Sequence, residues 1–203
     1  MKKEKNRNLN RIGRRFSLKT PFFESLSYIK ESKNYIYFII AIFIFSTIIA
    51  FAFPDYFSYF DKLLKDLLNK TEGLSGFSLI SFIFTNNVVS AGLGLFFGVV
   101  FGIFSIINAM INGSVLGYVF AKVYALSGAG NFWRILPHGI FELPAIFIAL
   151  GLGVKLGLFV FSKNMKQEFL RRFYSSFLVF LLIIVPLLVI AAIIEGLLIT
   201  ILG

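Results

Sequence analysis

The chain has 203 residues, of which 58% are hydrophobic and 15% are charged, and its formal net charge is +10. These apolar side chains outnumber what one soluble core can bury, so the composition favours an integral membrane protein over a soluble domain or a classical enzyme. The basic residues flank apolar stretches and carry no base-stacking motif, which favours anionic lipid headgroups over nucleic acid as the partner. The lack of cysteine excludes disulfides, thiol nucleophiles and thiolate metal sites.

Residues 1–34 form a basic segment, with ten Lys and Arg against three Glu. Near its end, apolar residues recur at helical spacing between Lys19 and Lys30, which predicts a helix that lies at the membrane surface. Its apolar residues are Phe22, Phe23, Leu26 and Ile29, preceded by Pro21.

Five stretches are apolar enough to cross about 30 Å of hydrocarbon, which takes roughly 20 helical residues. We predict spans at about 35–53, 82–107, 114–126, 138–161 and 177–202, so that 35–203 forms an all-α transmembrane bundle. No residue between Glu72 and Lys122 is charged, and we place two spans there with a tight polar turn at 108–113. Asn108 and Asn112 are expected to cap helix ends at this turn.

Residues 55–70 predict an amphipathic helix on the membrane surface, or a solvated helix packed on the bundle. Its apolar positions are Tyr56, Phe60, Leu63, Leu64, Leu67 and Leu68. They lie opposite Asp55, Asp61, Lys62, Lys65, Asp66 and Lys70.

The distribution of Lys and Arg predicts the orientation. With five crossings, the basic segment and the basic connection between spans four and five fall on the same side, which is the cytoplasm by the positive-inside rule. That connection carries Lys163, Lys166, Arg171 and Arg172. We therefore expect a multi-pass protein of the cell membrane with its N-terminus in the cytoplasm and its C-terminus outside. In span four, Lys155 is expected to extend toward the cytoplasmic headgroups.

Small residues repeat every four positions in spans two to four, where they permit close helix packing. The set comprises Ser90, Gly94, Gly98, Gly102, Gly113, Gly117, Ala121, Ala145, Ala149, Gly153 and Gly157. The alternatives to packing within one chain are a homodimer interface and a pore.

Ionisable residues at membrane depth are costly, so each suggests a functional site. His138 and Glu142 share a helix face, and Pro144 predicts a kink because its ring clashes with the carbonyl group of Ile140. We predict a polar cluster in the outer leaflet. Its candidate members are Asn86, Asn87, Lys122, His138, Glu142 and Glu195.

Three interpretations of this cluster remain open: a structural hydrogen-bond network, a protonatable or ligand-binding site facing a hydrated cavity, and a metal-dependent hydrolase site. A zinc site would need His138, Glu142 and Glu195 together, without the HExxH spacing. No Asp lies in a span to complete a Ser-His-Asp triad. We therefore expect no catalytic residue, no metal and no cofactor.

Several of these motifs together resemble the stage II sporulation protein M family, over roughly residues 77–203. The most specific element is the run Pro137-His138-Gly139-x-x-Glu142-x-Pro144-Ala145. It is accompanied by Phe84 to Asn87, Asn112-Gly113, Gly117, Gly153 to Gly157, and Ala192-x-x-Glu195-Gly196.

The resemblance implies five spans, an internal N-terminus and no enzymatic activity. In spore formers, the namesake is a membrane partner of a lytic transglycosylase and an amidase-type hydrolase that remodel septal peptidoglycan. The family also occurs outside spore formers. The leading hypothesis is a membrane scaffold that acts with envelope proteins in membrane remodelling. The alternatives are a transporter, channel or lipid-moving protein that uses the polar cluster, and an intramembrane hydrolase.

Overall fold

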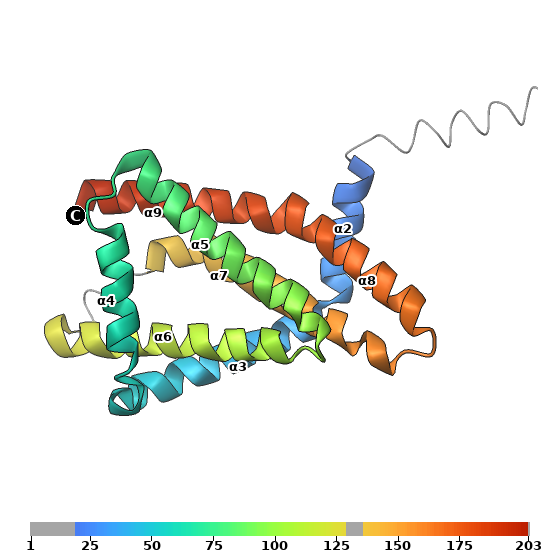
Figure 1. Ribbon diagram of the computed structural model, residues 1–203, viewed down its shortest axis with the longest axis horizontal. Coiled ribbons are helices and arrows are strands. Elements are labelled where there is room, and N and C mark those ends of the chain that lie inside the picture. Colours follow the sequence, from blue (N-terminus) through green and yellow to red (C-terminus); the bar gives the residue numbers. More distant parts are fainter. Residues whose placement is uncertain (1–18, 129–135, 203) are drawn as a thin grey trace, which may run out of the picture.

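The computed structural model describes residues 19–128 and 136–202, which form helices joined by short connections (Figure 1). No strand occurs in this part of the chain, so the predicted all-α class is confirmed. Of residue 19 and of residues 136–138 and 199–202, only the backbone is described.

Five helical segments are long and apolar enough to cross a membrane, as predicted. They are preceded by α2 (Lys19–Glu31), and a short helix α4 (Phe60–Thr71) follows the first of them after the 3₁₀ turn η2 (Pro54–Phe57). The five are α3 (Lys33–Ala52), α5 with η3 (Gly76–Phe96, Phe97–Val99), α6 (Ile103–Ser127), α7 with η5 (Leu136–Gly157, Leu158–Phe161), and α8 with α9 (Met165–Val179, Val185–Leu202). A π-helical turn, Phe180–Ile184, joins α8 to α9.

The five segments alternate in direction, so the bundle has two distinct ends (Figure 1). At one, here called the α4 end, α4 extends from the end of α3 toward the start of α5, and α7 begins nearby. At the other, the α2 end, α2 and α8 approach the start of α3 and the end of α7. The basic residues of α2 and of the connection before α8 therefore lie at the same end, as five crossings require.

The reversal between spans two and three differs from the predicted position. The helix α6 continues through residues 108–113, and the chain turns instead at residues 100–102, where Phe101 and Gly102 have φ values of 54° and 74°. Glycine adopts this left-handed conformation without a Cβ penalty. Asn108 and Asn112 cap no helix end: Asn112 Nδ2 donates to the backbone oxygen and to Oδ1 of Asn108, at 2.9 and 2.8 Å.

Glycines bring α6 against the backbone of α3. A Cβ atom on Gly113 would collide with the carbonyl group of Phe43, and one on Gly117 would collide with that of Thr47. The two helices are in contact along much of their length. Helices in lipid associate through such close van der Waals contact because the hydrophobic effect does not drive them together.

A second close contact joins the α5–η3 segment to α7. The backbone carbonyl of Gly153 lies where a Cβ of Gly98 would stand, and the backbone of Gly98 and Gly102 excludes one from Gly157. Ala145 and Ala149, on the same helix, are fully buried. Gly98, Gly113, Gly117, Gly153 and Gly157 therefore face neighbouring helices of the same chain.

We predict that Gly117→Ala lowers the stability of the purified protein by about 1–3 kcal/mol, because the added methyl group overpacks the α3 backbone. The matched control is Gly92→Ala, since a Cβ there would meet only the Phe180 ring at an ordinary 3.5 Å. The stability of the Gly92→Ala protein should be unchanged or slightly higher, because alanine favours the helical conformation more than glycine does. Thermal unfolding in detergent checks both, and equal melting temperatures would contradict the close contact.

Candidate functional site

Three of the predicted polar residues come together from three different spans. The amide of Asn87 on α5 is placed to donate to the carboxyl group of Glu142 on α7. Glu195 on α9 is near enough to interact electrostatically with the same carboxyl group. Asn87 is buried, with 8% of its surface exposed, so the amide is withdrawn from the lipid-facing side of α5. We call these three residues the carboxylate cluster.

The other predicted members are placed differently. Asn86 is exposed on a different face of α5 from Asn87, because adjacent helical residues differ by 100°. Lys122 belongs to a separate contact with α4. The backbone of His138 lies in the first turn of α7, but its side chain lies outside the described residues. The helix continues through Pro144.

A cavity of about 700 Å³ lies beside Glu142, between α3, α6 and α7. Its walls are apolar except for Glu142 and Asn112. Ligand pockets in proteins commonly span roughly 300–1,000 Å³ and combine apolar walls with a few polar groups. The cavity is therefore of a size and composition that suits a small amphiphilic molecule.

At the α4 end, α4 is attached to α6 by a buried aromatic side chain and an ion pair. Phe60 is 5% exposed and lies near the Tyr118 ring, whose hydroxyl donates to Asp61 at 2.7 Å. Lys122 Nζ is 3.3 Å from the other oxygen of Asp61. The hydrogen bond from Tyr118, with a further one from Lys122, lowers the pKa of the Asp61 carboxyl.

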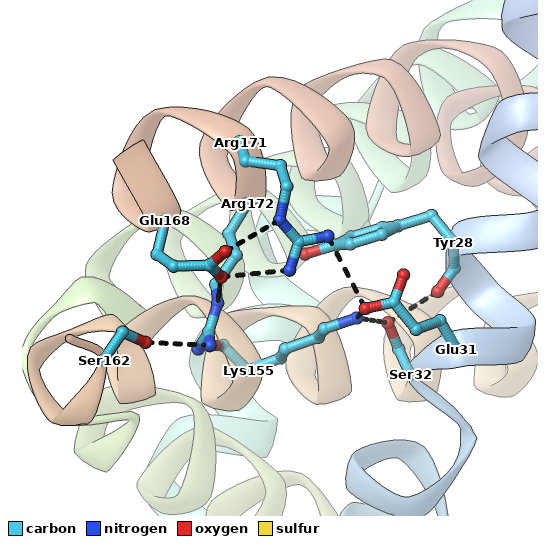
Figure 2. A network of polar contacts seen from close by, with 8 residues as sticks. All are labelled: Tyr28, Glu31, Ser32, Lys155, Ser162, Glu168, Arg171 and Arg172. Carbon is cyan, nitrogen blue, oxygen red and sulfur yellow. Dashed lines mark hydrogen bonds and ion pairs between the residues drawn. The ribbon is translucent and has the colours of Figure 1, made fainter. Parts of the chain in front are cut away.

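A second polar network lies at the α2 end and centres on Lys155 (Figure 2). Lys155 is 4% exposed, and its ammonium group is 2.9 Å from Glu31 Oε1 and 3.0 Å from Ser32 Oγ. It also lies 3.9 Å from the centroid of the Tyr28 ring, in cation–π geometry. The hydrogen bond from Lys155 lowers the pKa of Glu31, whereas burial raises the pKa of Tyr28.

Two arginines of α8 extend this network. Arg172 donates to the backbone oxygen of Lys155 at 2.6 Å and to Glu168 at 3.0 Å. Arg171 pairs with Glu168 at 3.0 Å and lies 3.5 Å from Glu31 (Figure 2). The network thus connects α2, the start of α3, the end of α7 and α8, and it holds α2 against the bundle.

This network was not predicted from the sequence, which suggested that Lys155 extends to the headgroups. The difference has a physical reason: a buried ammonium ion needs a partner, and Glu31 is 124 positions away along the chain. The four-residue spacing of Glu168 and Arg172 is the one sequence pattern that indicates an ion pair of this network, because residues four apart share a helix face. No pattern in the sequence around Lys155 or Glu31 indicates that these two residues pair.

Across the described part of the chain, no group of three His, Cys, Asp or Glu side chains is arranged to hold a metal ion. The carboxylate cluster instead offers hydrogen-bond acceptors in an apolar surrounding. Such a site can take up a proton or accept hydrogen bonds from a ligand.

Residues 37–199 match the model of a protein family described as SpoIIM, stage II sporulation protein M. The match covers most of the chain, including all three residues of the carboxylate cluster and Lys155, but not α2. No curated protein and no solved structure gives a significant match.

We predict that Glu31→Gln destabilises the protein at pH 7, because it leaves the buried Lys155 ammonium without its anionic partner. The Glu31 pKa is lowered from 4.5 in the folded state, so its stabilising effect is complete above that value. The effect is lost as the pH falls through the lowered pKa. The melting temperatures of variant and native protein should therefore converge in acid.

The matched control is Glu24→Gln, which makes the same change at an exposed position of α2. At pH 7 its melting temperature should equal that of the native protein. A Glu31→Gln variant that is as stable as the native protein at pH 7 would show that the ion pair contributes nothing.

Proposed function

The chain belongs to the stage II sporulation protein M family, and from this premise we propose that it is a non-enzymatic membrane scaffold acting with partner proteins in envelope or membrane remodelling. A scaffold needs a rigid body and a surface held in a fixed position for its partner. The backbone contacts at Gly98, Gly117 and Gly157 support the first requirement. The surface of α4 supports the second.

The exposed apolar side of α4 is the observation on which the proposal depends. The polar attachment through Asp61 fixes the helix, yet Leu63, Leu67 and Leu68 are 52%, 41% and 67% exposed. These leucines are therefore not used to pack α4 on the bundle. A fixed helix with an unoccupied apolar side can bind a partner protein or the bilayer surface.

The basic residues near α2 support an orientation with the α2 end in the cytoplasm. Lys30 and Lys33 are exposed there, as are Lys163 in the connection before α8 and Lys166 in its first turn. Anionic headgroups of the inner leaflet are the expected lipid contact. In this orientation α4 and the C-terminus lie outside the cell membrane, on the side of the envelope.

We predict that a photo-crosslinking residue at Leu67 forms a discrete adduct with an envelope protein in native membranes, whereas one at Ile48 forms lipid adducts. Ile48 is a suitable reference because it is 60% exposed within α3. Asp61→Asn should reduce the Leu67 adduct severalfold, since a neutral amide weakens the contacts with Lys122 and Tyr118. Gel mobility and mass spectrometry identify the adducts.

The control for this substitution is Asp66→Asn, which changes an exposed carboxylate on the same helix. It should preserve the adduct. The proposal fails if Leu67 gives lipid adducts alone while vesicles containing the purified protein show solute flux. That result would identify a transporter.

A further inference from the structure

We propose that the cavity between α3, α6 and α7, here called the Glu142 groove, binds a membrane lipid whose headgroup carries a primary ammonium group. This binding site is separate from the α4 surface and does not depend on the scaffold function. Its three supports are the apolar walls, the opening toward the bilayer and the acceptor groups at one side.

The walls of the groove suit a hydrocarbon chain. One helix, α6, contributes a nearly continuous apolar side, and α7 contributes a second one opposite to it. The lining residues are Phe43 of α3, Val115, Leu116, Val119 and Phe120 of α6, and Gly139, Ile140, Leu143 and Ile146 of α7. A volume of about 700 Å³ with this lining is sufficient for part of a lipid molecule rather than for a single water or ion.

The groove opens where lipid is the surrounding medium. Its α6 and α7 walls belong to two candidate membrane spans, Ile103–Ser127 and Gly139–Phe161. At the rim, Ile140 is 66% exposed, and a Cβ on Gly139 would meet only the side chain of Leu143. Glu142 is six residues from the start of α7, or about 9 Å along the helix. The carboxyl group therefore lies in one leaflet, at the α4 end.

Both polar side chains in the wall present acceptors. A carboxylate accepts hydrogen bonds only, and the amide nitrogen of Asn112 is already donating to Asn108. The carboxyl group of Glu195 lies near enough to act electrostatically on that of Glu142. An ammonium headgroup supplies both positive charge and N–H donors. A phosphate at the same place would meet acceptors and like charge, so the groove selects the amine end of an aminolipid.

The experiment is native mass spectrometry of the full chain in detergent with three lipid probes that share palmitoyl and oleoyl chains. Phosphatidylethanolamine has three N–H donors, phosphatidylcholine has a cation without donors, and phosphatidylglycerol has no amine. We predict preferential retention of phosphatidylethanolamine. Glu142→Gln should weaken its binding about tenfold, because a charge-assisted hydrogen bond becomes a neutral one.

A second substitution tests the walls. Val119→Trp fills the groove from α6 and should reduce the binding of all three lipids, whereas Ile193→Trp, at an exposed position of α9, should not. If Val119→Trp does not fold, Glu142→Gln still decides, because it preserves the side-chain volume.

Equal retention of phosphatidylethanolamine and phosphatidylcholine by the native protein would overturn the proposal. So would a Val119→Trp protein that keeps its lipid but changes from a dimer to a monomer, since the groove would then be an interface between copies. The crosslinked adduct at Leu67 of α4 does not depend on lipid binding in the Glu142 groove. A failure of the lipid proposal would therefore leave the scaffold proposal unaffected.

Discussion

Close contact between backbones is the constraint on which the rest of this bundle depends. Apolar side chains gain little by leaving lipid for a protein interior, so helices that meet in a membrane must gain by packing closely or by polar bonding. Gly117 lets α6 approach the carbonyl groups of α3, and Gly98 and Gly157 let η3 and α7 approach each other. The structure therefore contains two tightly packed groups of helices, α3 with α6 and α5 with α7.

Polar contacts then attach the two helices that the glycine contacts do not hold, α2 and α4. The helices α2 and α4 lie outside the five long segments, and each is attached through a carboxylate that pairs with a lysine of the bundle. Glu31 meets Lys155 at the α2 end, where Ser32 also contacts the ammonium group. Asp61 meets Lys122 and Tyr118 at the α4 end. The same chemistry serves both ends, and each attachment leaves apolar side chains of the attached helix exposed, such as Phe23 and Leu68.

The sequence predicted features that depend on short-range patterns, and it missed those that depend on distant pairs. Apolar length indicated five spans, and helical periodicity located α2 and α4. The turn between α5 and α6 was misplaced because no charged residue marks it and the polar residues Asn108 and Asn112 suggested a turn at 108–113. The left-handed conformation of Gly102 is not visible in hydropathy. Among the polar residues, the predicted topology placed Asn87, Glu142 and Glu195 in one group, and in the structure Asn87 and Glu195 both interact with Glu142. It could not separate Lys122 from them, because the partner of Lys122 is on a helix outside the spans.

The location of the Glu142 groove follows from how the two packed groups meet. At the α2 end they are joined closely: Gly151 lies against the backbone of Ile36, and Lys155 reaches from α7 to Glu31 and Ser32. Toward the α4 end the groove separates α6 from α7, although each remains packed on its own glycine partner. Because neither helix can close the gap without giving up a backbone contact, the space persists and exposes the carboxyl group of Glu142. Close packing on two separate sides of the bundle thus leaves this space between α6 and α7, and it places the carboxyl group of Glu142 in its wall.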